Sequence, residues 1–392
     1  MDVAVVGSGP AGASAAYVLA SHGLSPLLIE RSRHPRDKVC GEACTPRAVR
    51  SLQRMGLLAQ LAPQGASVRR AVLISPSGRE LQTDLPVFQG QALVVSRRIL
   101  DAQLVERAVA AGARLVDGRA VERVERHGRK LLVRFERGDS LQVDLVLGCD
   151  GVGSVVRRSL GAPKIPAGHR AFAIRAIFED AKLPAADALT VVWERSLLPA
   201  YGWIFPLPGG RANVGIGIRA DRLRAKGQAL PALFERFLAM PRVREALAGA
   251  QMAGRAQGHP LPYSSSWGPC VMDGAMLAGD AAGLVNPLTG EGIDLAIESG
   301  ELAGEVGCEA LARGDASAAG LRSYQRLCEA TFGRVLRLNG WLGIAFAVPW
   351  VLDRLFKAGR NNARLRQDLA QIALGGQRAE VTSRMIAALV FA

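Results

Sequence analysis

The sequence is poor in the side chains that most often bind metal ions. It has 5 histidines and 6 cysteines in 392 residues, and none of the cysteines forms a CxxC pair. Structural metal sites need closely spaced ligands of these types. We therefore expect no metal site, and free cysteines fit a reducing cytoplasm.

Long apolar runs are also absent. No stretch reaches the roughly 18 uninterrupted apolar residues of a helix that spans a membrane. The chain starts with a strand-like pattern and lacks the charged segment and apolar run of a signal peptide. The expected location is therefore the cytoplasm.

Acidic residues are fewer than basic ones, with 35 Asp and Glu against 49 Lys and Arg and a formal net charge of +14. The basic residues are nearly all arginine, spread along the chain, and no nucleic-acid motif accompanies them. We expect no nucleic-acid partner. A basic face toward anionic lipid or a phosphorylated substrate is one explanation of the charge, and solvated surface arginine is the plainer one.

The clearest pattern lies at the N-terminus. Residues 3–6 form an apolar run rich in β-branched side chains, as a buried parallel strand does. It is followed by the segment GSGPAG at 7–12, a helical pattern from 13 to 22, and a second apolar run that ends in Glu30. This order predicts a β-turn-α-β unit with an acid at the end of its second strand.

Each glycine of this segment has a physical role in binding a dinucleotide. Gly7 permits the tight turn, Gly9 lets a pyrophosphate approach the backbone, and Gly12 lets the helix pack closely on the strand. The helix N-terminus attracts the phosphates through its free N–H groups and its dipole. Glu30 would accept hydrogen bonds from the adenosine ribose, and an ordinary glycine-rich turn would leave this acid unexplained.

Two later apolar strands also end in an aspartate. Residues 145–148 run into Asp150, in CDGVGSVVR, and residues 275–278 run into Asp280, in LAGDAAGLVNPLTGEGI. Between them, residues 170–217 carry many β-branched residues and repeated turns, which predicts an antiparallel sheet. The chain beyond residue 320 has a helical pattern with a break at Pro349.

These three motifs together resemble the FAD-dependent oxidoreductases of aromatic-hydroxylase type, and within them the geranylgeranyl reductase family. Two segments narrow the resemblance: DKVCGEACTPRAV at 37–49 is similar to the family's Cys-Gly loop, and PAYGWIFP at 199–206 is similar to its PxYxWxFP motif. The resemblance covers roughly residues 1–330. That family reduces double bonds of prenyl chains on lipids, quinones or chlorophyll precursors.

The resemblance implies an α/β fold, which becomes α+β overall when the antiparallel sheet is counted. It comprises a Rossmann-like FAD-binding domain, an antiparallel-sheet substrate domain and a helical C-terminal tail. The expected ranges are 1–67, 96–165 and 262–330 for the FAD-binding domain, 68–95 and 166–261 for the substrate domain, and 331–392 for the tail.

The resemblance also implies which residues contact FAD. Asp280 would hold a ribityl hydroxyl, and the backbone N–H groups of Gly292 and Ile293 would face the flavin O2 side, where negative charge collects on reduction. Arg97 would reach a phosphate, with a surface arginine as the plainer interpretation. Asp150 would support the pyrophosphate region from behind; helix capping is the plainer role for both aspartates. The full predicted FAD set is Gly7, Gly9, Pro10, Ala11, Gly12, Glu30, Arg31, Cys40, Gly41, Arg97, Val121, Asp150, Gly279, Asp280, Gly290, Gly292 and Ile293.

Tyr201, Trp203 and Phe205 alternate in sequence, so on a strand all three point to one face. We predict that they form an aromatic wall along a channel for an apolar substrate, with Pro287 in the same pocket. The plainer interpretation is the core face of a half-buried sheet.

Cys40 lies in a glycine-flanked loop that the resemblance places beside the flavin. Glu42 follows Gly41 where many family members have a second glycine, and this departure could reshape the pocket. A small buried hydrophobic side chain is the plainer role for Cys40. The predicted catalytic residues are Cys40, Tyr201 and Trp203.

The predicted reaction is reduction of an isolated double bond in a prenyl chain, with hydride from flavin N5 and a proton from a weak acid. Cys40 and Tyr201 are the candidate acids. No second GxGxxG lies in a strand-turn-helix pattern, so the external donor is open between NADPH and reduced ferredoxin.

Two other classes of function remain open. An FAD-dependent monooxygenase would hydroxylate or epoxidise a hydrophobic small molecule on the same fold, and its consumption of oxygen would reveal it. A halogenase is a weaker variant of this alternative. The segment YGWIFP is similar to the WxWxIP motif of halogenases, but that group needs a lysine near the flavin in the N-terminal half, and no lysine lies between Lys38 and Lys130. A non-enzymatic flavoprotein or lipid carrier would hold a flavin that stays inert to reductants.

Residues 338–352, LNGWLGIAFAVPWVL, predict peripheral contact with the cytoplasmic face of a membrane. The run is too short to span a bilayer, and Trp341 and Trp350 are side chains favoured at a membrane interface. The alternative is a helix that packs its apolar face on the FAD domain. Basic residues that would meet anionic head groups follow: Arg354, Lys357, Arg360, Arg364 and Arg366.

Overall fold

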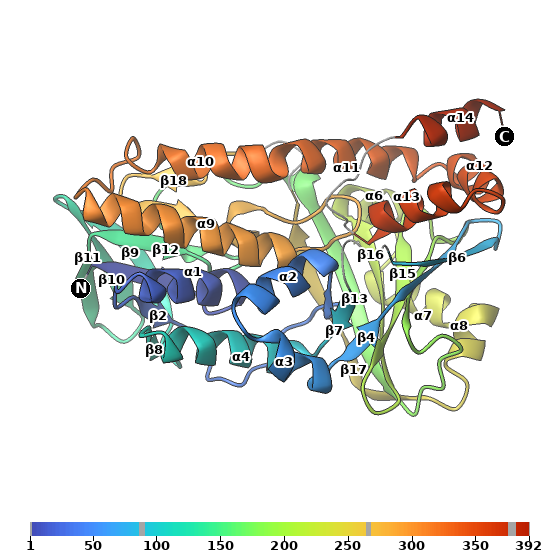
Figure 1. The fold of residues 1–392 in the computed structure, drawn as a ribbon, viewed down its shortest axis with the longest axis horizontal. Helices are drawn as coiled ribbons and strands as arrows, with labels where there is room; N and C mark the ends of the chain where they lie inside the picture. Colours follow the sequence, from blue (N-terminus) through green and yellow to red (C-terminus); the bar gives the residue numbers. More distant parts are fainter. Residues whose placement is uncertain (1, 86–90, 264–267, 375–381, 392) are drawn as a thin grey trace.

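Two sheets lie one after the other along the long axis of the molecule, with the N-terminus at the far end of the first and the C-terminus beyond the second (Figure 1). The structure is a computed structural model that describes residues 2–85, 91–263, 268–374 and 382–391. The predicted α/β fold is confirmed. The domain ranges given above stay a prediction.

The first sheet has six strands in the order β18-β19-β12-β1-β2-β8. All neighbours pair in parallel except β18 and β19. Its four inner strands β19, β12, β1 and β2 are buried apolar runs, as expected for a parallel sheet covered on both faces, whereas the edge strands β18 and β8 are partly exposed. The bounds are β1 Val3–Val6, β2 Leu27–Ile29, β8 Arg114–Val116, β12 Leu145–Gly148, β18 Val271–Met272 and β19 Ala275–Leu277.

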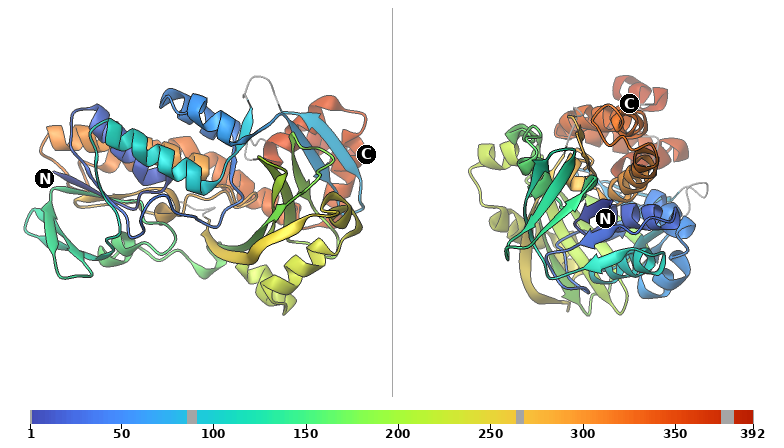
Figure 2. Two further views of the ribbon diagram at one scale, coloured as in Figure 1. Left: turned by 90° about the horizontal axis from the view of Figure 1, so that it is seen from below. Right: turned by 90° about the vertical axis from the view of Figure 1, so that its left-hand side faces the viewer.

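Helices α1 (Pro10–Ser21), α4 (Arg97–Ala110) and α9 (Ile293–Ala312) cover one face of this sheet (Figure 1). Small residues let α1 and α9 approach closely. A Cβ added at Gly300 would lie 2.1 Å from the Ala11 carbonyl oxygen, and one at Gly304 would lie 2.7 Å from the Val18 side chain. The other face carries a three-stranded sheet of β9 (Val121–His127), β10 (Lys130–Phe135) and β11 (Ser140–Val143), as the second view in Figure 2 shows.

The second sheet has seven strands in the order β17-β13-β16-β15-β14-β5-β6. The predicted antiparallel pairing is confirmed for its neighbours except β14 and β5, which run parallel. Helices α6 (Ala220–Lys226), α7 (Leu230–Leu238) and α8 (Pro241–Ala246) cover its outer face. The strand bounds are β17 Gln251–Pro262, β13 Arg170–Glu179, β16 Arg211–Arg219, β15 Tyr201–Leu207, β14 Ala188–Val192, β5 Arg70–Ile74 and β6 Glu80–Asp84.

A small sheet of β3 (Ala43–Cys44), β7 (Ala92–Val94) and β4 (Ala66–Val68) lies where the two large sheets meet. The pattern after Thr45 predicts one helix to about residue 61. The structure instead has α2 (Pro46–Arg54) and α3 (Leu58–Leu61). Gly56 separates them because its φ of 75° is incompatible with a continuing right-handed helix.

The C-terminal region is helical, as predicted, and the predicted break at Pro349 is confirmed, because α11 ends at Ala345 and Pro349 begins the next helix. Among the described residues, no single helix is long and apolar enough to cross a membrane. The segments Arg322–Ala345 and Pro349–Gly359 reach the necessary length and hydropathy only when taken together, and their axes are bent by 103°. The elements are α10 (Arg322–Cys328), a π-helical turn (Glu329–Gly333), α11 (Arg334–Ala345), α12 (Pro349–Gly359), α13 (Ala363–Ala373) and α14 (Ser383–Phe391).

Candidate functional site

The glycine turn after β1 has the geometry that its sequence predicts. Gly7 has a φ of 95°, and a Cβ there would lie 2.4 Å from the Cys149 carbonyl oxygen. A Cβ at Gly12 would lie 1.8 Å from the Gly7 carbonyl oxygen. Any side chain at either position would therefore displace the backbone, whereas a Cβ at Gly9, the N-cap of α1, would meet only side-chain ends at ordinary contact distance.

Two guanidinium groups lie beside Gly9. A Cβ at that position would lie 3.7 Å from Arg36 Nη2 and 3.9 Å from Arg97 Nη2. The buried Asp101 carboxylate holds both side chains, at 2.7 Å from Arg97 Nε and 3.0 Å from Arg36 Nη1. Arg97 is 3% exposed, so the surface-arginine interpretation is wrong. The helix N-terminus and the two arginines suit a pyrophosphate and are called the pyrophosphate site below, and the contact itself stays a prediction. The sequence analysis did not identify Arg36 or Asp101.

Glu30 lies at the end of β2 and next to the glycine turn. Its carboxylate accepts hydrogen bonds from the backbone N–H and the hydroxyl of Ser8, at 3.1 and 2.9 Å, and from the Ser32 N–H at 3.1 Å. Burial opposes its charge, but Arg36 and these donors outweigh it and hold the pKa of Glu30 below its usual range. Glu30 is thus an ionised acceptor beside the pyrophosphate site.

The two aspartates that end strands have different surroundings. Asp150 accepts hydrogen bonds from the backbone N–H groups of Val155 and Val156, at 2.6 and 3.2 Å, so it caps α5 (Val155–Ser159) directly behind Gly7. Asp280 makes no capping hydrogen bond and lies 3.4 Å from Lys38 Nζ. The helix-cap interpretation therefore holds for Asp150 and is wrong for Asp280.

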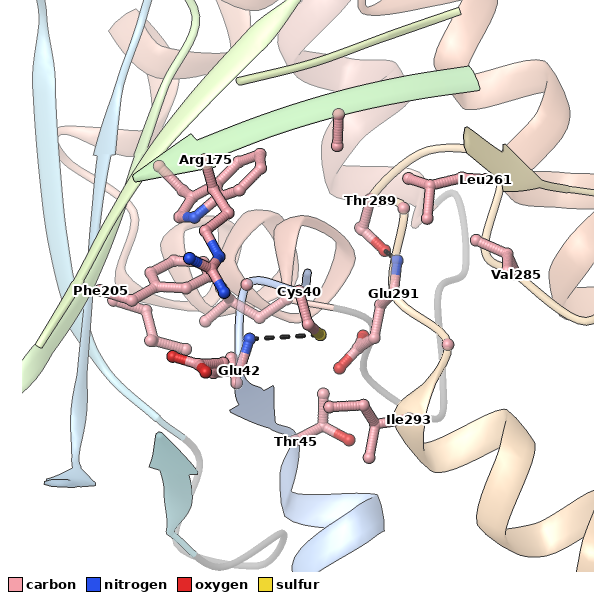
Figure 3. A pocket seen from close by; sticks show the side chains of 18 of the residues that line it. Cys40, Glu42, Thr45, Arg175, Phe205, Leu261, Val285, Thr289, Glu291 and Ile293 are labelled. Carbon is pink, nitrogen blue, oxygen red and sulfur yellow. Dashed lines mark hydrogen bonds between the residues drawn. The ribbon is translucent and has the colours of Figure 1, made fainter. Parts of the chain in front are cut away.

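A cavity of about 1280 Å³, including its open mouth, lies between the two large sheets. The loop before α9, with Glu291, forms one side, and the Cys40 loop and Phe205 of β15 form the other (Figure 3). Asp280 also lines the cavity. The predicted site residues on its wall are Pro10, Cys40, Gly41, Arg97, Tyr201, Trp203, Phe205, Asp280, Gly290, Gly292 and Ile293.

Tyr201, Trp203 and Phe205 all line this cavity, with adjacent ring centroids 6.1 and 6.2 Å apart. Glycines of the neighbouring strand make room for them. A Cβ at Gly215, which pairs with Trp203, would lie 2.3 Å from the indole ring. The opposite face of β15 packs on α7, where a Cβ at Gly202 would lie 2.3 Å from the Phe237 ring. The alternation therefore separates an aromatic cavity wall from the core.

A buried hydrogen-bond chain connects this wall to the pyrophosphate site. Trp203 Nε1 donates to Asn213 Oδ1 at 3.0 Å, and Asn213 Nδ2 donates to the Glu42 carboxylate at 3.1 Å. Glu42 in turn accepts from the Arg97 backbone N–H at 3.3 Å. Burial raises the pKa of Glu42, and the hydrogen bond from Asn213 partly offsets this rise. Glu42 has a φ of 66°, the left-handed conformation that glycine adopts most easily.

Cys40 and Tyr201 face the cavity, and the polar atom of each takes part in one hydrogen bond. Cys40 Sγ accepts a hydrogen bond from the Glu42 N–H at 3.3 Å (Figure 3). The Tyr201 hydroxyl donates to the Thr289 carbonyl oxygen, and burial raises the pKa of this phenol. The cavity wall also carries Glu291, which the sequence analysis did not single out; its position between Gly290 and Gly292 was the available signal.

A second, smaller cavity adjoins the first. Both have Tyr201, Leu261, Val285 and Gly290 on their walls. Pro287 lies in this second cavity and not in the main one, together with residues of α11 such as Ile344. The second cavity therefore leads from the aromatic wall toward the C-terminal helices.

Among the described residues, nine of the predicted FAD contacts line neither cavity: Gly7, Gly9, Ala11, Gly12, Glu30, Arg31, Val121, Asp150 and Gly279. Arg31 and Val121 also lie outside the glycine turn and its neighbouring strand ends. Arg31 is exposed, next to Glu30. Val121 is 8% exposed and begins β9, within the core of the first half. Neither lines either cavity within the described part of the chain, so their contact with FAD stays a prediction.

Comparison with known proteins gives an independent view of this site. A family described as FAD binding domain matches residues 1–339. Digeranylgeranylglycerophospholipid reductase 1 of Methanopyrus kandleri is 34% identical over 340 residues, covering 84% of this chain and 86% of that relative. Menaquinone reductase of Mycolicibacterium smegmatis is 33% identical over 314 residues, which cover 78% of this chain and 76% of that relative.

Solved structures share the fold. A geranylgeranyl bacteriochlorophyll reductase-like protein of Thermoplasma acidophilum has a TM-score of 0.84 at 24% identity, covering 100% of this chain and 96% of its own. The flavin-dependent brominase Bmp2 has a TM-score of 0.80 at 21% identity, covering 99% of this chain and 97% of its own. At these identities the likeness concerns the fold alone.

The residues of this site fit FAD, which is the cofactor of this chain. The N-terminus of α1 with Arg36 and Arg97 suits the pyrophosphate, Glu30 suits the ribose, and the Asp280 side of the cavity suits the flavin half. The geometry of the site, the match to the FAD binding domain family and the sequence identity to the reductases all indicate an FAD-dependent oxidoreductase. The chain belongs to the geranylgeranyl reductase family of FAD-dependent oxidoreductases.

Proposed function

We propose that this enzyme reduces carbon–carbon double bonds in a prenyl chain carried by a lipid or a quinone. The observation that carries the proposal is the shared cavity, in which the predicted flavin-binding loop faces an apolar, aromatic wall. Relatives named as reductases of digeranylgeranylglycerophospholipid and of menaquinone support this substrate class.

The bound FAD supplies a hydride from its N5 atom. The chain's own residues hold the cofactor and stabilise the charges that develop. Gly292 is the N-cap of the 20-residue helix α9, so its N–H and that of Ile293 present positive partial charge to the cavity. The faces of Tyr201, Trp203 and Phe205 favour the positive charge that develops on a tertiary alkene carbon.

The second cavity supports the proposal that the substrate reaches the aromatic wall from a membrane. Large apolar side chains are exposed around the turn between α11 and α12: Trp341 is 73% exposed, Trp350 58%, Ile344 48% and Val348 38%. Of the basic residues that follow, Lys357, Arg360 and Arg364 are exposed, whereas Arg366 caps backbone carbonyl oxygens of α12. We propose that this surface, called the Trp341–Trp350 patch below, docks on an anionic membrane. A prenyl chain would then enter through the second cavity, past Ile344.

The test is mass spectrometry of prenyl lipids and menaquinone incubated anaerobically with dithionite-reduced enzyme. Reduction of one double bond raises the substrate mass by two hydrogen atoms. A product that gains an oxygen atom, and only when oxygen is admitted, would instead establish a monooxygenase. Replacing dithionite by NADPH or by reduced ferredoxin then identifies the external electron donor.

A further inference from the structure

One acidic side chain of the main cavity has no assigned role. Glu291 belongs to the loop before α9, and its carboxyl group points into the cavity toward Cys40 Sγ (Figure 3). The loop holds its backbone firmly, because the Asn286 N–H donates to the Glu291 carbonyl oxygen at 2.8 Å and the Glu291 N–H donates to Thr289 Oγ1 at 3.3 Å. No side chain in the described part of the chain donates a hydrogen bond to the carboxyl group of Glu291.

The surroundings of Glu291 favour its neutral form. Burial and the nearby Asp294 raise its pKa well above the usual value, with a further contribution from Cys40. Arg47 opposes this rise, but its guanidinium is already paired with both oxygens of Glu298. The groups that face Glu291 are Asp294 on α9, Arg47 on α2, Cys40 before β3, Cys44 on β3 and Tyr201 on β15.

We infer that Glu291 is the acid that protonates the substrate, in place of Cys40 or Tyr201. Tyr201 already donates its proton to the Thr289 carbonyl oxygen. Cys40 Sγ accepts a hydrogen bond from the Glu42 N–H and keeps its own proton, but a carboxyl group is intrinsically a stronger acid than a thiol. The Glu291 proton meets no acceptor among the described residues and lies at the cavity surface. This inference rests on the proposed function, because it needs an alkene in the cavity.

A hydride adds to one alkene carbon, and the electron pair of the double bond takes the Glu291 proton at the other carbon. Glu291 is left as a carboxylate and is protonated again from solvent. The two electrons that leave with the hydride are replaced by the external donor, which is dithionite in the assay.

The test compares Glu291→Gln with wild type in anaerobic reduction of prenyl lipid by dithionite-reduced enzyme. We expect a loss of activity of about a hundredfold or more, with FAD content unchanged, because glutamine keeps the shape and has no proton to give. Glu291→Asp should recover part of the activity. Glu301→Gln is the matched control: it removes another acid of α9 with a raised pKa, outside the cavity, and should leave activity unchanged.

Two measurements do not depend on the rate alone. Wild-type activity should fall as the pH rises through the pKa of Glu291, and this fall should be absent from the residual activity of Glu291→Gln. Infrared spectra of the protein at pH 7 should contain a protonated carboxyl band, sensitive to deuterium oxide, that Glu291→Gln lacks and Glu301→Gln retains.

The outcomes separate the two proposals. Wild type that reduces prenyl lipid, together with an equally active Glu291→Gln, would overturn the role of Glu291 and leave the proposed function standing. Absence of the infrared band from wild type would overturn it as well. Wild type that leaves every prenyl substrate unreduced would overturn the proposed function and, with it, the role of Glu291.

Discussion

At the scale of single residues, the chain of hydrogen bonds from Trp203 through Asn213 and Glu42 to Arg97 joins the two halves of the site. Each donor and acceptor is buried, so removing one partner leaves another unsatisfied in a low dielectric. The chain fixes the aromatic wall relative to the pyrophosphate site.

Glu30→Arg should abolish FAD binding. The substitution removes the acceptor next to Ser8 and places a third cation beside Arg36 and Arg97 without its balancing acid. Flavin absorbance per protein after purification measures the loss. Glu122→Arg, at an exposed position of β9, is the control and should keep its flavin. Full flavin occupancy in Glu30→Arg would contradict the role of Glu30.

Trp203→Ala should lower turnover far more than FAD content. Loss of an aromatic face near the developing cation is worth about a tenfold fall in rate, and Trp203→Phe should keep most of that rate. Prenyl reduction and flavin content are measured on the same preparations. Phe237→Leu, behind the same sheet, is the control for lost packing and should affect stability without selectively lowering turnover. Precipitation of Trp203→Ala, or a loss of FAD in step with the loss of turnover, would assign Trp203 to the core alone.

At the scale of elements, the sequence predicts best what is local. The β1–α1–β2 unit follows from adjacent residues, because the turn after Val6, the helix and the acid at position 30 are set by neighbours in the chain. Asp101 is marked by one local pattern, its i,i+4 pair with Arg97 on α4, but its second partner Arg36 lies far away in the sequence. Asn213 gains its role only from distant segments such as Glu42, and no local pattern marks it.

The turn between α11 and α12 yields a prediction at this scale. The protein should sediment with anionic liposomes, and salt should weaken the binding, because each exposed Lys or Arg at the surface contributes about 1 kcal/mol. Replacing Trp341 and Trp350 together by serine should abolish binding. Leu327→Ser removes an apolar side chain of α10 that is 40% exposed and lies outside the Trp341–Trp350 patch, so it should not change binding. Failure of the wild type to bind would contradict the docking proposal.

At the scale of the whole molecule, the site exists only between two bodies of structure. The six-stranded sheet and α1 present the cofactor site, the seven-stranded sheet presents the aromatic wall, and the C-terminal helices close the second cavity. Most of the side chains that line the main cavity near the aromatic wall are apolar, which disfavours water around the reacting groups.

The most direct test of this account follows the flavin absorbance of anaerobic, dithionite-reduced enzyme, freed of excess dithionite, after mixing with a prenyl lipid. The account predicts that the oxidised flavin spectrum returns in step with the loss of one double bond per flavin, with no oxygen present. A flavin that stays reduced until oxygen is admitted, with a product that then carries a new oxygen atom, would contradict it.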